Sequence, residues 1–450
     1  MKKTLLSIFA VISSSICMAQ LPSAIDIAGQ MYPGWNLGNT LEAGDGASVC
    51  FTTDTNGHLN YETYWQGTPT SQQIIDFVKA QGFRSVRIPC AWMMGHVNNA
   101  TDVQIDANWM KRVREIVDYC INDGLYVVLN DHWDGGWLEN NLAAYDAETA
   151  RQLKSMWTQI ALEFNDYDEH LLFAGFNEPD CNENNNPKPA RIEALMKYEQ
   201  DFVDAVRATG GNNASRTLVV QAPSTSIEHA YQYLKMPTDV IEDRLMVEVH
   251  YYTPPQFTGI WENNQPMYFW GAGNHVSSGT FAQNNSTWGE ESYVAEQFDM
   301  MYKKFASKGI PVILGEYGAN WRDLGNQAAQ RKHDASIKLY NKVICQYAID
   351  RGMIPYLWDI NSPSQNGKNG IMTVINRKDC TIFCKPAMEG IKEGTSTGKW
   401  PNITSAIEQV SDDEPDSQAS QSDAYDIYGR KVKANSHSFI IRDGRKYLYR

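Results

Sequence analysis

The sequence predicts an α/β protein, a (β/α)8 TIM barrel with a short C-terminal β tail. Short apolar segments typical of buried strands alternate with helical segments along most of the chain. Polar or aromatic residues stand at the C-terminal ends of most of these strands, which is where such barrels carry their functional groups. A doubly wound open sheet is the alternative, but the sequence lacks the glycine-rich phosphate turn that supports a nucleotide-binding sheet.

The predicted strands are short apolar runs, as expected for strands that are buried on both faces. They span residues 33–38, 84–89, 125–131, 171–177, 217–221, 245–250, 310–315 and 354–358. The predicted helices lie between and after them, at residues 71–81, 107–122, 147–164, 190–208, 226–234, 291–308, 329–351 and 385–392. The helix at 107–122 has the clearest pattern, because Trp109, Val113, Ile116 and Cys120 recur at helical spacing.

The composition limits the size of the fold and the kind of partner. The chain has 450 residues, 42% of them hydrophobic, which is enough for a sizeable core in one large domain or two. Its formal net charge is −14. A nucleic-acid partner requires a basic surface that neutralises phosphates, so we expect no nucleic-acid binding. We expect a monomer.

Four segments follow one another along the chain. Residues 1–19 have the basic start, apolar stretch and small-residue cleavage site of a secretory signal. Residues 20–405 hold the predicted barrel, and residues 406–423 are acidic and polar, as in a flexible linker. Residues 424–450 form a basic tail with a predicted hairpin at Asp443-Gly444. No other segment is long and apolar enough to span a bilayer, so we expect a secreted or cell-surface protein.

Two glutamates stand at the tips of predicted buried strands. The run at 171–180 ends in Asn177-Glu178-Pro179-Asp180, and the run at 310–318 carries Glu316. Partial desolvation at such a position raises the pKa of a carboxyl group and suits it to general-acid work. A helix-capping or loop carboxylate would explain Glu178 alone. Two glutamates in the same setting are what a two-carboxylate glycosidase requires.

Other strand ends repeat this pattern of functional groups. The residues concerned are Asn36, Arg87, Asp131, His132, Asn177, His250 and Trp358. Structural residues have no reason to place such groups at the same end of so many strands. Two long loops, 39–70 and 251–290, are rich in Tyr and Trp, and we interpret them as walls of a cleft.

With these residues assembled, the chain resembles glycoside hydrolase family 5, the secreted retaining β-glycanases that include many endoglucanases. The similarity covers residues 30–395 approximately. It rests on Gly34-Trp35-Asn36-Leu37-Gly38-Asn39-Thr40, Val86-Arg87-Ile88-Pro89, Asn130-Asp131-His132-Trp133-Asp134-Gly135-Gly136-Trp137, Phe176-Asn177-Glu178-Pro179, His250-Tyr251-Tyr252, Gly315-Glu316-Tyr317-Gly318 and Trp358. The family fold is the (β/α)8 barrel, which agrees with the count of strands.

The resemblance implies roles for the two glutamates and for the groups around them. Glu178 would be the general acid and then the general base, and Glu316 the nucleophile, with carboxyl groups about 5–5.5 Å apart. Arg87 and the Tyr252 hydroxyl would keep Glu316 ionised. Asn177 would hydrogen-bond the 2-OH of the sugar.

Four further residues have supporting roles by the same resemblance. His132 and His250 would bind sugar hydroxyls or orient Glu178, and Trp358 would form the stacking floor under the sugar. Asn36 is also expected to be a substrate-binding or supporting residue. Trp137 is either a subsite platform or a packing residue.

Several alternatives stay open from the sequence. The cluster of Asp131, His132 and Asp134 suggests a metal, but we see no further ligand set and the family needs none, so we expect no metal and no cofactor. Arg87 could instead belong to a structural ion pair. The substrate is expected to be a β-1,4-linked polysaccharide, with an endo-β-1,4-glucanase, a xyloglucanase, a lichenase and a β-mannanase all possible. A non-catalytic glycan-binding protein is the remote alternative.

The tail resembles the C-terminal sorting signals of type IX secretion in Bacteroidetes. The similarity rests on Tyr428-Gly429-Arg430-Lys431-Val432 and on the closing Arg- and Lys-rich strand. It implies export across the outer membrane. A small β module is the alternative interpretation.

Overall fold

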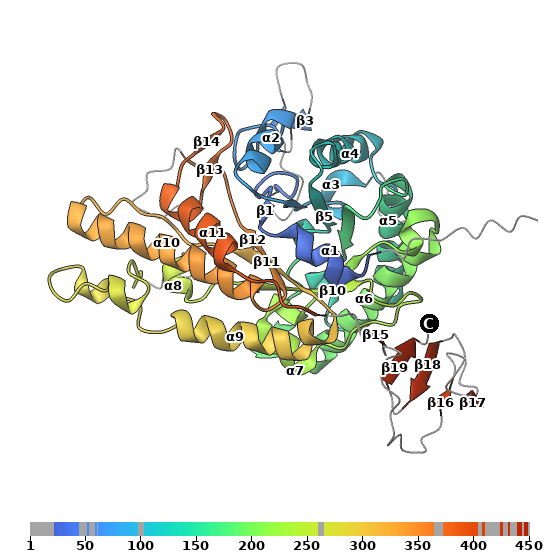
Figure 1. Ribbon diagram of the computed structural model, residues 1–450. Coiled ribbons are helices and arrows are strands. Elements are labelled where there is room, and N and C mark those ends of the chain that lie inside the picture. Colours follow the sequence, from blue (N-terminus) through green and yellow to red (C-terminus); the bar gives the residue numbers. More distant parts are fainter. Residues whose placement is uncertain are drawn as a thin grey trace, which may run out of the picture.

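Eight parallel strands close into a barrel, as the sequence predicts (Figure 1). Around the ring the order is β1-β12-β11-β10-β9-β6-β5-β4. The strands are β1 Gly34–Asn36, β4 Ser85–Ile88, β5 Tyr126–Asn130, β6 Leu171–Ala174, β9 Leu218–Gln221, β10 Leu245–Tyr251, β11 Val312–Tyr317 and β12 Met353–Leu357. Seven of them agree with the predicted bounds to within two residues at each end, while β6 stops three residues before the end of the predicted strand at 171–177. The (β/α)8 prediction is confirmed.

The computed structural model describes residues 22–44, 62–97, 103–259, 265–363 and 372–403, together with short strands outside these ranges. Helices surround the barrel (Figure 1). They are α1 Ala24–Met31, α2 Gln72–Ala80, α3 Met93–His96, α4 Ala107–Asn122, α5 Ala147–Glu163, α6 Pro189–Ala208, α7 Ile227–Tyr233, α8 Pro255–Thr258, α9 Glu291–Lys304, α10 Gln327–Ile349 and α11 Lys385–Thr397. Helix α1 is absent from the sequence prediction. It begins with a capping box in which Ser23 and Asp26 bond each other's backbone.

The barrel closes where β1 pairs with both β12 and β4. Gly34 stands opposite Tyr356 in this pairing. A Cβ atom at position 34 would lie 2.4 Å from the Tyr356 ring, so only glycine lets the first and last strands approach each other here.

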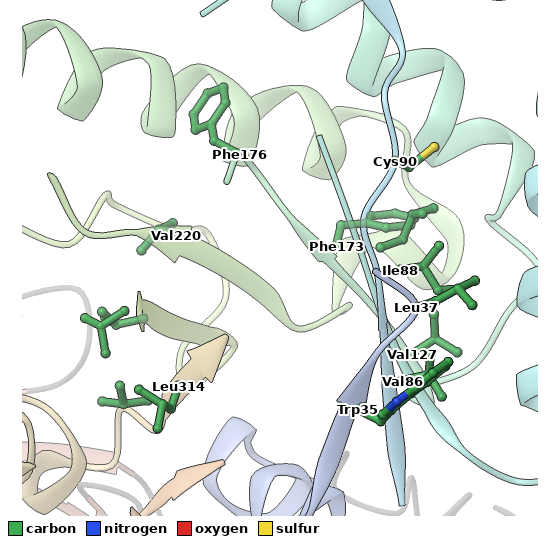
Figure 2. Close-up of a cluster of buried hydrophobic side chains, with 14 of the residues drawn as sticks. Trp35, Leu37, Val86, Ile88, Cys90, Val127, Phe173, Phe176, Val220 and Leu314 are labelled. Carbon is green, nitrogen blue, oxygen red and sulfur yellow. The ribbon is translucent and has the colours of Figure 1, made fainter. Parts of the chain in front are cut away.

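The main hydrophobic core lies between the barrel and its helices. Alternate residues of the strands point outward into it, because successive side chains of a strand lie on opposite faces. Figure 2 shows members of this layer, among them Trp35, Val86, Ile88 and Phe173, all of them essentially inaccessible to solvent. Close packing of this layer fixes the positions of the strands and therefore of the groups at their ends.

The inside of the barrel changes character along its axis. At the N-terminal end of the strands, α1 packs Ile27 and Met31 into an apolar cluster with inward-facing residues such as Val128 and Ile313. Two residues further along the strands, the inward positions become polar: β4 has Arg87 after Ser85. Strands β1, β5, β9 and β10 place Asn36, Asn130, Gln221 and Glu248 at this level. The carboxyl end of the barrel is therefore a buried polar layer above an apolar plug.

Short strand pairs complete the structure. They are β2 Thr52–Thr53 with β3 Leu59–Asn60, β7 Asn182–Glu183 with β8 Asn186–Pro187, and β13 Ile375–Asn376 with β14 Thr381–Ile382. The tail contributes a further sheet, made of β15 Ile407–Gln409, β16 Ala424–Tyr425, β17 Lys431–Val432, β18 Phe439–Arg442 and β19 Arg445–Leu448. Strands β18 and β19 are antiparallel and Arg442 pairs with Arg445, which agrees with the hairpin predicted at Asp443-Gly444.

The remaining segment predictions are not decided by the fold. The signal at 1–19 lies outside the described residues, and so does most of the linker at 406–423. The boundaries 20–405 and 424–450 stay predictions. Within the part of the chain that the structure describes, no helix has the length and apolar character needed to cross a bilayer.

Candidate active site

The carboxyl ends of the barrel strands bring most of the sequence-predicted site residues together. Asn36 ends β1 and Arg87 lies in β4, while His132 comes two residues after β5. Asn177 and Glu178 follow the end of β6 by three and four residues. The other residues stand on or directly after β10, β11 and β12; they are His250, Tyr252, Glu316 and Trp358. This convergence is a consequence of parallel strands in a closed barrel, whose carboxyl ends all face the same side.

Glu316 is almost fully buried, and hydrogen-bond donors hold both of its carboxylate oxygens. The Oε1 atom accepts from Arg87 Nη1 at 3.1 Å, and Oε2 accepts from the Tyr252 hydroxyl at 2.9 Å. A bulge places the side chain, because the pairing of β11 with β10 shifts register between Leu314 and Glu316. The carboxylate is therefore fixed in orientation as well as in position.

Arg87 is the common partner of the groups around Glu316, and its side chain is 0% exposed. Its Nη1 donates to Asn36 Oδ1 at 3.0 Å, and its Nη2 donates to Asn177 Oδ1 at 2.8 Å. Asn36 in turn donates to the carbonyl of Gly315 at 2.8 Å and thereby anchors the bulge before Glu316. Asn36 thus supports the site from within the barrel.

Glu178 has a more open setting than Glu316. Its side chain is 49% exposed, compared with 8% for Glu316. His250 Nδ1 lies 2.6 Å from Glu178 Oε1 and 3.7 Å from Glu316 Oε2, so the imidazole ring contacts both carboxylates. One carboxylate oxygen of each glutamate and a ring nitrogen of His250 all lie within 4.8 Å of one another.

The charges of these groups determine their pKa values. Burial acts to lower the pKa of His250, but the neighbouring Glu316, Glu178 and Glu248 carboxylates raise it to about 10. Desolvation acts to raise the pKa of Glu178, yet the hydrogen bond and charge of His250 outweigh it and lower that pKa. Burial raises the pKa of Glu316 against the opposing effects of His250 and Arg87.

This order differs from the expectation that Glu178 has the raised pKa and Glu316 stays ionised. The reason is the position of His250, whose Nδ1 atom lies 2.6 Å from Glu178 but 3.7 Å from Glu316. The hydrogen bond and charge of His250 therefore dominate at Glu178, whereas burial dominates at Glu316.

Aromatic rings line the site beyond the carboxylates. The His132 and Trp358 rings are stacked, with centroids 5.6 Å apart and planes 6° from parallel. Next to His132, the Trp133 ring lies 6.3 Å from the ring of Trp65, which is 37% exposed. Aromatic rings of this kind are surfaces on which sugar rings stack.

Three comparisons place these observations among known proteins. The family model "Cellulase (glycosyl hydrolase family 5)" matches residues 45–364. Endoglucanase A of Paenibacillus barcinonensis is 33% identical over 389 residues, which are 83% of this chain and 90% of that protein. The chain belongs to glycoside hydrolase family 5.

Other members of family 5 differ in the substrate that their names give. A xyloglucan-specific endo-beta-1,4-glucanase of Bacteroides ovatus is 34% identical over 75% of this chain and 65% of its own length. The crystal structure of a xyloglucan-specific beta-1,4-glucanase from a ruminal metagenomic library is 46% identical, with a TM-score of 0.76, and covers 85% of this chain and 98% of that one. A broad-specificity endoglucanase from Bacteroides salanitronis is 31% identical, with a TM-score of 0.71, over 84% and 95% of the two chains. The predicted enzyme class, a glycoside hydrolase of the endo-β-1,4-glucanase type, is confirmed at this level.

The loop predictions are only partly correct for this family 5 enzyme. Gln66 in the first loop accepts a hydrogen bond from Asn361 Nδ2 at 2.7 Å, so this loop reaches the segment that follows Trp358. In the second loop, however, Trp270 is fully buried and packs edge-on against Tyr340. It belongs to the core and not to a cleft wall, because its indole N–H is satisfied within the loop. Trp137 is half-buried and packs against the core, and its role in sugar binding stays a prediction.

The structure adds two polar residues that the sequence analysis missed, Glu248 and Gln221, and it gives a contact to Asn130, which was named there only as part of a motif. Glu248 in β10 lies 3.1 Å from His250 Nε2, and it accepts a hydrogen bond from the Gln221 side chain in β9 at 2.8 Å. Asn130 at the end of β5 has its Nδ2 atom 3.2 Å from His132 Nδ1. Because an amide nitrogen only donates, His132 Nδ1 accepts and its Nε2 carries the proton that faces Glu316, 4.0 Å away. The signal that could have found these residues is a polar side chain at an inward-facing position of an otherwise apolar strand.

A metal ion does not suit this site. Within the described residues, Glu178, His250 and Glu316 form the one group of three with the spacing of metal ligands. Arg87, however, already contacts Glu316, and a His250 with a pKa of about 10 keeps both ring nitrogens protonated near neutral pH. Arg87 and His250 therefore already supply the positive charge that a metal ion would bring to the two carboxylates.

The hydroxyl of Tyr252 gives the first test of this geometry. Tyr252→Phe removes one of the donors to Glu316 but keeps the ring, and we expect kcat to fall about 10- to 100-fold, since a hydrogen bond to a charged group contributes about 1.5–3 kcal/mol. The neighbouring Tyr251 is the matched control, because its ring packs against Phe298 in the core outside the barrel and away from Glu316. Tyr251→Phe should leave kcat within about two-fold. Equal losses in the two variants would contradict the role of the Tyr252 hydroxyl.

Proposed function

We propose that this enzyme is a retaining endo-β-1,4-glucanase that cleaves cellulose or a related β-glucan by double displacement. The observation that carries the proposal is the spacing of the two glutamates, whose nearest oxygens lie within 4.8 Å. Retaining enzymes hold their carboxyl groups about 5–5.5 Å apart, whereas inverting enzymes need about 6.5–9.5 Å to admit a water. The short spacing favours direct attack by one carboxylate.

Glu316 is the nucleophile in this proposal. It is enclosed and oriented by Arg87 and Tyr252, so one oxygen can attack the anomeric carbon without a prior rotation. The new bond joins that oxygen to C1, the bond from C1 to the leaving oxygen breaks, and Glu178 gives its proton to the leaving oxygen. The product of this step is a glycosyl ester on Glu316.

Water completes the cycle through Glu178. Now ionised, Glu178 takes a proton from a water whose oxygen attacks C1, and the Glu316 carboxylate departs. His250 orients Glu178 through the 2.6 Å contact and stays between the two carboxylates during both steps. We assign Asn177 to the sugar 2-OH and Trp358 to the floor beneath the ring, because both border the carboxylate pair.

We also propose that the enzyme acts outside the cell. The support is the secretory signal sequence at 1–19 and the tail at 424–450, which resembles an outer-membrane sorting signal. A large polymer cannot enter a cell intact, so an endo-acting enzyme of this class needs export to meet its substrate.

The nucleophile is tested by chemical rescue. Glu316→Ala should abolish turnover and leave the fold intact, because Glu248, Asn36 and Asn177 remain as partners of the buried Arg87. Added azide should then restore part of the cleavage of an activated glycoside and give the β-linked glycosyl azide, which NMR identifies. An inverted product from the unaltered enzyme, together with no rescue, would overturn the assignment.

The acid role is tested by the leaving group. Glu178→Ala should retain the first step on substrates with very good leaving groups, which need no protonation, and lose about 10²- to 10⁴-fold on unactivated glucan. The measurement is kcat/KM on a series of aryl cellobiosides against leaving-group pKa. A flat, equal loss across the series would exclude Glu178 as the acid.

Xyloglucan is a second candidate substrate. It is favoured by the 46% identity to a structure described as a xyloglucan-specific β-1,4-glucanase, a higher identity than that to the broad-specificity endoglucanase. Rates on carboxymethyl-cellulose, xyloglucan, mixed-linkage glucan and mannan separate the candidates. We expect cleavage of the glucan-backbone polymers, and a xyloglucan preference of about ten-fold or more would mark a xyloglucanase. A preference for mannan would contradict a glucan backbone.

A further inference from the structure

A third glutamate, Glu248, lies beneath the catalytic pair. It is in β10, two residues before His250, so both side chains point into the barrel. Glu248 is 0% exposed, which places its carboxylate out of reach of a sugar. A buried carboxylate needs partners that compensate for its lost hydration.

Three donors supply that compensation. The Oε1 atom of Glu248 is 2.8 Å from Arg87 Nη2 and 3.1 Å from His250 Nε2, and Oε2 accepts from Gln221 Nε2 at 2.8 Å. The Oε1 atom of Glu248 therefore contacts both cations of the site, Arg87 and His250.

The neighbouring strand is shaped around this carboxylate. A Cβ atom at Gly315 would lie 2.0 Å from Glu248 Oε1, so a side chain at the bulge of β11 would displace it. The residue that precedes the nucleophile in sequence therefore has to be glycine for Glu248 to reach Arg87.

Five groups determine the state of His250. Carboxylates of Glu248, Glu178 and Glu316 lie 3.1, 2.6 and 3.7 Å from its ring nitrogens. Arg87 also contacts Glu248, and the neutral His132 lies close enough to His250 for their charges to interact. With Nε2 donating to Glu248, the other ring N–H is directed at Glu178.

We propose that Glu248 is a positioning residue of the reaction: it fixes Arg87 and His250 beneath the two catalytic glutamates and supplies the negative charge that lets both cations stay there throughout the cycle. The proposal rests on the retaining function proposed above and deepens it. Glu248 touches neither substrate nor a reacting atom and acts through its two partners.

The charge count shows why a third carboxylate is needed. Before the first step the site holds two cations, Arg87 and His250, and two anions, Glu316 and Glu248, while Glu178 carries its proton. After that step Glu316 is a neutral ester and Glu178 is the second anion. The sum is zero in both states, so glycosylation moves charge within the site but does not create any. Without Glu248 both states have an excess positive charge.

That excess has a measurable consequence. In Glu248→Gln the shape is kept but the anion is lost, and the uncompensated cations favour loss of the Glu178 proton, which lowers the pKa of the acid. We expect kcat to fall up to about 100-fold, as for a misplaced catalytic group. The alkaline limb of the pH profile of kcat, which reports the acid in the enzyme–substrate complex, should move to lower pH by about one unit. Glu248→Asp keeps the charge, so its alkaline limb should stay in place although its kcat falls.

Glu199 provides a matched control. It is equally buried and also contacts Gln221, whose backbone N–H donates to it at 2.7 Å. Burial raises the pKa of Glu199 well above its ordinary value, and Glu199→Gln keeps a side-chain oxygen that can accept from the Gln221 N–H. We expect its pH profile to match that of the unaltered enzyme, with kcat within about two-fold.

NMR spectroscopy tests the charge of His250 in the unaltered enzyme, where no substitution can disturb the fold. In the full-length enzyme with 15N-labelled histidine, we expect the His250 ring to be doubly protonated at pH 8, where an unperturbed histidine is neutral. A neutral His250 at that pH would overturn the proposal. So would a Glu248→Gln profile that keeps its alkaline limb, because a merely structural role lowers kcat without moving the limb.

These outcomes are separable from a failure of the proposed function. Retention of configuration and azide rescue at Glu316 depend on the catalytic pair alone. If they succeed while the Glu248→Gln limb stays in place, only the charge-balancing role is wrong. If the product is inverted, the retaining function itself is wrong, whatever Glu248 does.

Discussion

The burial of one guanidinium group is the constraint on which the site depends. Arg87 lies inside a closed barrel with no exposed side-chain surface, where an uncompensated charge would be very unfavourable. It is tolerated because Asn36, Asn177, Glu248 and Glu316 each place an oxygen within 3.1 Å of it. Each of those side chains is thereby held in one orientation. Glu316 in particular is oriented because it is a partner of this arginine.

The barrel makes that arrangement possible by separating stability from chemistry along its axis. The apolar cluster around α1 and the outer layer between strands and helices supply the hydrophobic stabilisation, at the N-terminal end and around the barrel. The polar layer at the carboxyl end is free to hold charges that contribute little net stability. Glycines at two joints, Gly34 and Gly315, mark where side chains of neighbouring strands need the space.

Much of this could be predicted from the sequence, and the exceptions have physical causes. Apolar runs located every barrel strand, and Glu178 and Glu316 stood out because a strand tip is a rare place for a carboxylate. Glu248 escaped notice because it lies inside an apolar run, where only its alternation with the outward residues reveals that it points inward. Trp270 was misplaced because the number of aromatic residues in a loop does not show which of them are packed. Helix α1 was missed because an eight-residue helix has too few turns for a clear period.

The difference in pKa between Glu178 and Glu316 depends on their surroundings in the folded chain, which no sequence motif encodes. Glu178 and Glu316 are both glutamates after apolar strands, and the difference between them is the exposure of one and the enclosure of the other. His250 lies closer to Glu178 than to Glu316, and it lowers the pKa of Glu178 while burial raises that of Glu316. The other ring nitrogen of His250 contacts Glu248, so the buried carboxylate in β10 fixes the ring that makes the two glutamates different.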